Sequence, residues 1–100
     1  MSPARLVLLT PRARADLDAI WAYSEEKWGR RRAEAYVRLI AKAFDDLAAG
    51  ASVARSAEDV RAGYFRLTVG SHVIFFRLPD DGSLTVVRIL HQRMDVSRHL

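Results

Sequence analysis

Apolar residues recur at helical spacing through two adjacent segments near the start of the chain. The first stripe, between Thr10 and Gly29, comprises Ala13, Leu17, Ile20, Trp21 and Trp28. The second stripe, between Arg30 and Ala49, comprises Ala33, Tyr36, Val37, Ile40, Phe44, Leu47 and Ala48. Steps of three, four and seven residues place such side chains on one face of an α-helix. Because a single glycine joins the segments, we predict a helical hairpin.

The ends of both helices carry recognisable signals. Thr10 is a good N-cap residue, and Pro11 suits the first helical position, where a missing N–H has no cost. Gly29 and Gly50 follow the two apolar stripes, at positions where glycine commonly ends a helix. The helices are therefore expected to span about residues 11–28 and 30–49.

Three strands are predicted in the second half of the chain. Residues 64–69 alternate between apolar and polar, while residues 71–78 form the most apolar run and are expected in the middle of a sheet. Residues 84–91 form the last strand. Gly70-Ser71 and the stretch 79–82 (PDDG) are turn signals between them. Tight turns between successive strands predict an antiparallel meander.

The remaining segments complete an α+β domain. Residues 5–9 read as a short N-terminal strand that pairs beside an edge strand of the meander, and residues 51–62 read as a loop. Both helical stripes are expected to pack on one face of the sheet. The other face should carry Arg66 and Arg88, joined by either His72 or Arg77 according to the register.

Length and composition limit the possible classes of protein. The 100 residues suit one small domain, 1–100, with one hydrophobic core. The chain has no cysteine, which excludes disulfides and thiolate metal sites. The first apolar run is four residues long, too short for a signal peptide core or a membrane span. We therefore expect a cytoplasmic protein without a membrane partner.

The positive charge is almost entirely arginine. The formal net charge is +4, and Lys27 and Lys42 are the only lysines. Arginine forms bidentate contacts with carboxylate and phosphate, so an acidic protein or a nucleic acid is a suitable partner. A solvated basic surface explains the composition equally well. No recognition-helix or RNA-binding motif favours a plain nucleic-acid binder.

The histidines do not have the spacing of a metal site. His72, His91 and His99 lack an H-x-x-x-H or H-E-x-x-H arrangement, and no carboxylate stands beside two of them at a ligand spacing. No metal and no cofactor are therefore expected.

A metal-free ribonuclease is the enzymatic alternative. Arg66 could stabilise phosphate charge, and His91 could act as acid or base. The simpler interpretation is that His91 ends a strand and Arg66 is a solvated cation. The sheet contains no Glu, and no Tyr or Lys lies near His91 in the sequence to complete a catalytic set. No Gly-x-Ser-x-Gly motif or glycine-rich phosphate loop supports nucleophilic chemistry.

Protein binding is the other class that the residues support. Tyr23, Trp28 and Tyr64 add aromatic area that could exceed what a small core holds, and Arg is abundant. Aromatic residues and Arg dominate interface energetics, so an apolar patch ringed by Arg would suit an amphipathic acidic helix. The alternative is that these aromatic residues complete the core.

Four stretches of the chain resemble the ParE family of toxins, within the ParE/RelE superfamily. They are PRARADLDAIWAYSEEKWG (11–29), AEAYVRLIAKAFDDLA (33–48), RAGYFRLTVGSHVIFFRL (61–78) and VVRILHQRMDVSRHL (86–100). The resemblance covers nearly the whole chain. It implies a RelE/ParE-like fold, with an N-terminal strand and an α-helical hairpin packed on a three-stranded antiparallel meander.

The resemblance also implies a function. Such proteins are toxins of type II toxin–antitoxin modules that inhibit DNA gyrase and block replication without being enzymes. A ParD-type antitoxin neutralises them through its C-terminal segment, and operator DNA is bound only indirectly, through the antitoxin. We expect that segment to be acidic and apolar, because this chain has an excess of Arg and could expose aromatic area. RelE-type members of the superfamily are ribosome-dependent mRNA endonucleases, and this is the alternative function. For that alternative the implied catalytic residues are Arg66 and His91.

Two groups of binding residues are expected on this basis. The tail is expected to contact gyrase through Arg93, Met94, Asp95, Arg98, His99 and Leu100. The antitoxin is expected to contact Tyr36, Arg38, Arg66 and Arg77. Removing residues 92–100 should abolish toxicity and leave antitoxin binding largely intact. The competing interpretation is that Met94 and Leu100 pack on the first helix, so that truncation unfolds the chain.

Overall fold

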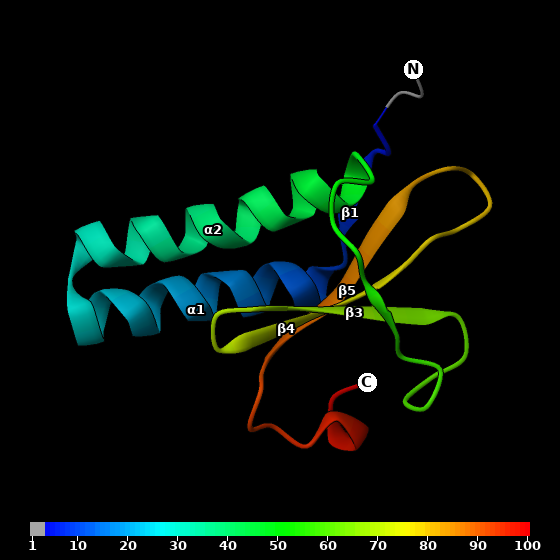
Figure 1. Ribbon diagram of the computed structural model, residues 1–100. Helices are drawn as coiled ribbons and strands as arrows, with labels where there is room; N and C mark the ends of the chain where they lie inside the picture. Colours follow the sequence, from blue (N-terminus) through cyan, green and yellow to red (C-terminus); the bar gives the residue numbers. More distant parts are fainter. Residues whose placement is uncertain (1–3) are drawn as a thin grey trace.

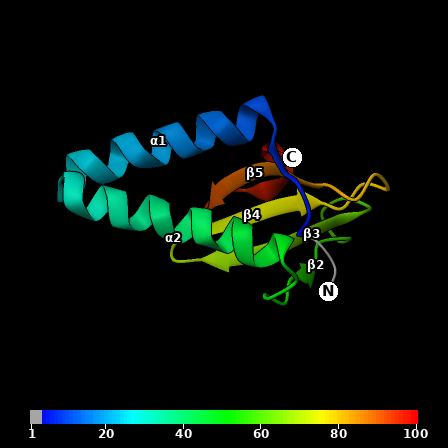
Figure 2. The same cartoon turned by 90° about the horizontal axis from the view of Figure 1, so that it is seen from above.

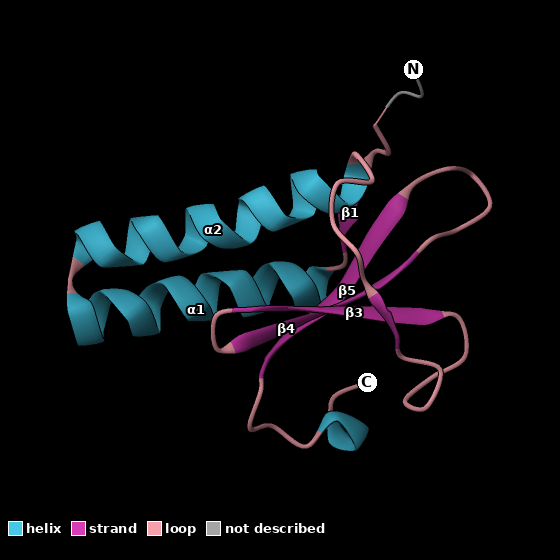
Figure 3. Ribbon diagram, in the orientation of Figure 1, coloured by secondary structure: helices cyan, strands magenta, loops and turns pink. Residues whose placement is uncertain are grey.

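The computed structural model describes residues 4–100 and has two long helices beside a twisted sheet (Figures 1 and 3). The helices are α1 (Pro11–Trp28) and α2 (Arg30–Ala48), and a short 3-10 helix, η1 (Val96–Arg98), lies near the end. The strands are β1 (Val7–Leu9), β2 (Arg55–Ser56), β3 (Tyr64–Val69), β4 (His72–Arg77) and β5 (Leu84–His91). Among residues 4–100, neither α1 nor α2 has the long apolar stretch that crossing a membrane requires.

The helical hairpin begins and turns where the sequence signals predict. The Thr10 hydroxyl oxygen accepts a hydrogen bond from the Ala13 N–H at 3.1 Å, which caps α1. Gly29 ends α1 with φ +85°, a conformation that favours glycine, and α2 begins at the next residue. The Thr10 hydroxyl also donates to the Val87 carbonyl at 2.7 Å, so the start of the hairpin is fixed to β5.

The sheet has the strand order β1-β5-β4-β3-β2. The predicted meander is confirmed, since β3, β4 and β5 pair in antiparallel succession. The N-terminal strand pairs in parallel with β5, which is an edge of that meander, as expected. Residues 51–62 are not all loop, because Arg55 and Ser56 pair with Arg66 and Phe65. A strand of two residues is too short to show alternation, so the sequence pattern could not reveal it.

Each face of the sheet has its own hydrophobic cluster. On the helix face, side chains of the sheet and of both helices form one cluster. Its buried residues are Ala13, Ile20, Ile40, Ala43, Phe44, Leu47, Ile74, Phe76, Leu84, Val86 and Ile89. The outer face buries Ala57, Tyr64, Phe75 and Leu90. In Figure 1 the helices lie above the sheet and the C-terminal tail lies below it, and Figure 2 shows the same layers from above. We call the two sides the helix face and the outer face.

The register decides which polar residues lie on the outer face. Arg66 pairs with Phe75, and Arg77 pairs with Tyr64, so both arginines lie on the outer face, because directly paired residues share a face. His72 lies instead on the helix face, where it bonds to Tyr36 of α2. Arg88 pairs with Phe75 and therefore lies on the outer face as expected, where its side chain is only 15% exposed and pairs with Asp16 of α1.

Candidate functional site: a groove beneath the helical hairpin

An apolar groove of about 800 Å³ lies between the helical hairpin and the ends of β4 and β5. Its lining residues are Asp16, Ala19, Ile20, Tyr23, Ser24, Trp28, Arg32, Ala35, Tyr36, Leu39, Ser71, His72, Ile89, His91 and Met94. The hairpin extends beyond the sheet, as Figure 1 shows, so the sheet covers only part of the apolar surface of the helices. A volume of this size lies within the range of ligand-binding clefts.

Large apolar side chains at the groove remain open to solvent. The exposed fractions are 56% for Tyr23, 53% for Trp28, 49% for Leu39 and 46% for Met94. The rings of Tyr23 and Trp28 meet edge to face, with centroids 6.1 Å apart. Of the two alternatives for the aromatic residues, exposure holds for Tyr23 and Trp28, whereas Tyr64 is buried in the outer-face cluster. These exposed apolar side chains make the groove a candidate interaction site.

The floor of the groove is built on Tyr36. Its hydroxyl lies 2.6 Å from His72 Nδ1 and accepts a hydrogen bond from the Ser71 N–H at 3.1 Å. The ring also lies against Gly70, where an added Cβ would come within 2.8 Å of the Tyr36 ring atoms. Gly70 has φ +57°, so both its backbone conformation and this close approach require glycine. Tyr36 thus joins α2 to the β3–β4 turn.

Two histidines lie side by side on this floor. His72 and His91 are directly paired across β4 and β5, and their ring centroids are 5.3 Å apart. His91 Nδ1 accepts a hydrogen bond from the Arg93 N–H at 3.1 Å. Burial lowers the pKa of His72, the neighbouring His91 lowers it further, and Asp16 acts in the opposite direction. His72 is therefore neutral at pH 7.

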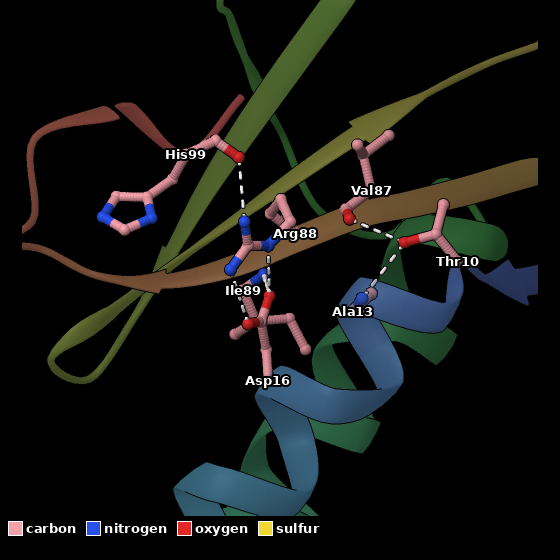
Figure 4. Close-up of polar contacts among 7 residues, drawn as sticks. All are labelled: Thr10, Ala13, Asp16, Val87, Arg88, Ile89 and His99. Carbon is pink, nitrogen blue, oxygen red and sulfur yellow. Dashed lines mark hydrogen bonds and ion pairs between the residues drawn. The ribbon is translucent and has the colours of Figure 1, made fainter. Parts of the chain in front are cut away.

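One wall of the groove is held by a buried ion pair between α1 and β5 (Figure 4). Arg88 donates to both carboxylate oxygens of Asp16 at 2.8 Å, and the Ile89 N–H donates to the same carboxylate at 2.9 Å. The third guanidinium contact is to the His99 carbonyl at 2.9 Å. Hydrogen bonding to Asp16 raises the pKa of Arg88. This cluster connects the first helix, the last strand and the tail.

The structure separates the two residues of the candidate nuclease set. Arg66 lies on the outer face and pairs with Asp59 at 3.3 Å, while His91 lies on the helix face beside His72. The sheet itself stands between them. The sequence analysis found no Tyr near His91, but Tyr36, which was predicted as an antitoxin contact and lies 55 residues earlier, reaches the same floor through His72. Only the pairing of His72 with His91 reveals this neighbourhood.

The predicted tail residues divide into two groups. Arg93, Met94, Asp95 and Arg98 are exposed, whereas His99 and Leu100 are half-buried. Leu100, which the competing interpretation placed on the first helix, packs with Val96 against the outer-face cluster. Met94 lines the groove. The tail therefore covers part of the outer face and contributes one side chain to the groove.

The four candidate antitoxin contacts do not form one surface. Tyr36 lies in the groove, Arg38 is exposed on α2, and Arg66 and Arg77 lie on the outer face. Among these residues the structure brings only Tyr36 to the groove. Within residues 4–100, no three or more His, Asp or Glu side chains cluster so that they could hold a metal ion.

The described residues form a helical hairpin packed on one face of a mixed five-stranded sheet, and this architecture defines the structural class of the protein. Residues 7–96 match the family described as "ParE toxin of type II toxin-antitoxin system, parDE", and the chain belongs to this family. It is 44% identical over 93 residues to "Toxin ParE1" of Mycobacterium tuberculosis (strain ATCC 25618 / H37Rv), which is 93% of this chain and 95% of that protein.

Two further comparisons agree with this family. "Toxin ParE1" of Caulobacter vibrioides (strain ATCC 19089 / CIP 103742 / CB 15) is 40% identical over 100 residues, covering 100% of this chain and 99% of that protein. The fold also matches a solved structure described as "Chromosomal ParDE TA system from P. aeruginosa" with a TM-score of 0.76 and 26% identity. That match covers 90% of this chain and 98% of the other.

Proposed function

We propose that this ParE-family toxin inhibits DNA gyrase and blocks replication, and that a ParD-type antitoxin neutralises it. Membership of the ParE family supports the role as a toxin. The choice of DNA gyrase as the target rests on the resemblance to ParE toxins. The chain acts by binding and not by catalysis. The separation of Arg66 from His91 by the sheet supports this, because a metal-free nuclease needs both groups around one phosphate.

The groove is the feature that best accounts for the antitoxin. It combines exposed aromatic and aliphatic side chains with one cation, Arg32, which has no carboxylate partner among the described ion pairs. A segment that is apolar on one side and acidic on the other fits both properties. The similar P. aeruginosa structure is of a ParDE system, which supports a partner of this class.

The exposed part of the tail is the proposed contact with gyrase. Arg93, Met94, Asp95 and Arg98 project from a segment anchored by Leu100 on the outer face. An anchored segment loses less conformational entropy on binding than a free chain does. It therefore presents these four side chains in a fixed arrangement.

Pulse labelling after induction of this chain without antitoxin tests the target. Thymidine and methionine incorporation are followed side by side over the first minutes. Gyrase inhibition predicts that DNA synthesis falls first and that the DNA-damage response follows. An earlier fall in protein synthesis would favour the endonuclease alternative, and unchanged labelling would contradict both.

The groove is tested separately by the variant Leu39→Ala. Removing a half-exposed side chain from the wall should weaken antitoxin binding roughly tenfold, because the lost apolar contact contributes about 1–2 kcal/mol. Val53→Ala is the matched control, since Val53 is 92% exposed and does not line the groove. Equal affinities for the two variants, measured by calorimetry, would show that the antitoxin binds elsewhere.

A further inference from the structure

The Tyr36 hydroxyl bonds to His72, and the tautomer of the ring decides the direction of this hydrogen bond. Its oxygen already accepts the Ser71 N–H, so its own proton must go to one of two acceptors. His72 Nδ1 lies 2.6 Å away, whereas the Val69 carbonyl lies 3.4 Å away. When Tyr36 donates to the nearer of these acceptors, His72 Nδ1, the proton of the neutral ring is on Nε2.

His91 has the same tautomer for an independent reason. Its Nδ1 accepts the backbone N–H of Arg93, and a backbone N–H can only donate. The neutral ring must therefore carry its proton on Nε2. Neither Nε2 atom has a hydrogen-bond partner among the described residues, and no buried polar side-chain atom there lacks one. Both Nε2–H groups are consequently accessible from the groove that the two rings line.

The charges around this pair favour an anion. Asp16 is the one carboxylate lining the groove, and it is occupied by Arg88 and the Ile89 N–H. Arg32 on α2 faces the same space with its charge unpaired among the described ion pairs. The groups around His72 are thus Asp16 from α1, Tyr36 and Arg32 from α2, and His91 from β5. Two N–H donors and a cation are present in an otherwise apolar groove.

We propose that His72 and His91 form a binding site for a single carboxylate, supplied by an Asp or Glu of the segment that occupies the groove. This inference rests on the proposed function, in which that segment belongs to the antitoxin. The two imidazoles bind the acidic residue at one position along the segment, while the apolar walls contact the side chains next to it. The site therefore sets the register of the bound segment.

A carboxylate bound between His72 and His91 determines whether affinity rises or falls with pH. A carboxylate beside the imidazoles stabilises their charged form, so the complex takes up protons that the free toxin does not hold. Affinity then rises as pH falls below the ordinary pKa of histidine. An occupant that only places apolar groups on the floor would disfavour the charged form. In that case affinity would fall over the same range.

The first test is made on the free toxin by ¹⁵N NMR of the imidazole rings at neutral pH. Both His72 and His91 are expected as the Nε2–H tautomer. An Nδ1–H tautomer in either ring would overturn the proposal, because the ring would then present an acceptor to the groove. His99 is an internal reference, since it does not line the groove.

The second test measures the affinity of the ParD-type antitoxin encoded with this chain at about pH 7.5 and about pH 5.5. Binding should be about tenfold tighter at the lower pH, the gain expected when a charge-assisted hydrogen bond replaces a neutral one. The double variant His72→Gln/His91→Gln keeps amide N–H donors but cannot be protonated. It should bind as the wild type does at pH 7.5 and lose the gain at pH 5.5.

Two controls separate the possible failures. His99→Gln should keep the full pH dependence. If Leu39→Ala weakens binding but acidic pH does not strengthen it in the wild type, the groove is the binding site and the carboxylate site is wrong. If neither Leu39→Ala nor pH changes the affinity, docking in the groove itself is wrong.

Discussion

The two faces of the sheet are covered in different ways. The helix face is covered by long helices that are packed tightly at one end and extend past the sheet at the other, which leaves the groove. The outer face is covered by short pieces, the loop around Ala57 and Val60 and the tail residues Val96 and Leu100. Helices that are longer than the surface they cover leave part of their apolar side open to solvent. Short segments can fit the surface they cover and leave no such opening.

One cluster joins the two coverings. Arg88 reaches from β5 to Asp16 beneath the helices and to the His99 carbonyl in the tail (Figure 4). A change at this point should affect both faces, while a change within one covering should affect mainly that face. This difference can be tested by three variants with decreasing expected effect.

Asp16→Ala should have the largest effect on stability. The side chains of Asp16 and Arg88 are only 14% and 15% exposed, so removing one partner leaves a buried charge and an unpaired Ile89 N–H. Breaking a buried pair in this way costs about 3–5 kcal/mol. Urea denaturation followed by circular dichroism measures the loss of unfolding free energy.

Asp46→Ala is the matched control for that variant. It breaks the pair with Lys42 on α2, where the side chains are 36% and 71% exposed. An exposed pair of this spacing contributes about 0.3–0.5 kcal/mol. If the two variants lose equal stability, the pair between Asp16 and Arg88 does not connect the coverings.

Much of the fold could be predicted from the sequence because it depends on local signals. The spacing of apolar residues predicted the two helices. Thr10 and Gly29 predicted where the first helix begins and ends, and the tight turns predicted the meander. The strand at residues 55–56 was missed, because its pairing with β3 involves two residues and has no periodic pattern. Arg88 was placed on the correct face, but its pairing with Asp16, 72 residues away, has no local signal in the sequence.

The site was less predictable, because it is formed by contacts between distant segments. Exposed aromatic area was one of two alternatives that the sequence left open, and Tyr23 and Trp28 supply it, but the groove depends on how far the hairpin extends past the sheet. The cluster of Tyr36, His72 and His91 depends on strand register and on the packing of α2. Neither is encoded within a single segment.

Truncation after Asp95 should have an intermediate effect. It removes Val96 and Leu100 from the outer face and the His99 carbonyl from Arg88, but it leaves the helix-face core intact. Two half-buried apolar side chains correspond to about 2 kcal/mol of unfolding free energy. The chain should remain folded by circular dichroism and still bind antitoxin in the groove.

The same truncation tests the proposed role of the tail. Arg98 is lost and the anchor of Arg93 and Met94 is removed, so toxicity should fall sharply in a growth assay. A truncated chain that is folded and fully toxic would show that toxicity requires neither Arg98 nor the anchoring of Arg93 and Met94. A truncated chain that is unfolded would show that the outer covering is as important to stability as the helices are.

His72→Gln should have the smallest effect, and it is seen only in the pH dependence of stability. Because the pKa of His72 is lowered in the folded state, the unfolded chain binds more protons at mildly acidic pH. Stability is therefore full above the ordinary pKa of 6.5 and falls as pH drops from there through the lowered folded value. Gln cannot titrate, so the variant should lose less stability than the wild type between about pH 7.5 and pH 5.5.

The comparison uses urea unfolding at both pH values, above the range in which carboxylates titrate. His99→Gln changes a half-buried histidine of the outer covering and should keep the wild-type slope. If both variants retain the slope, the pH sensitivity does not arise at His72. If both flatten it equally, the outer covering is as sensitive to protonation as the groove floor, and the difference between the two faces does not extend to their electrostatics.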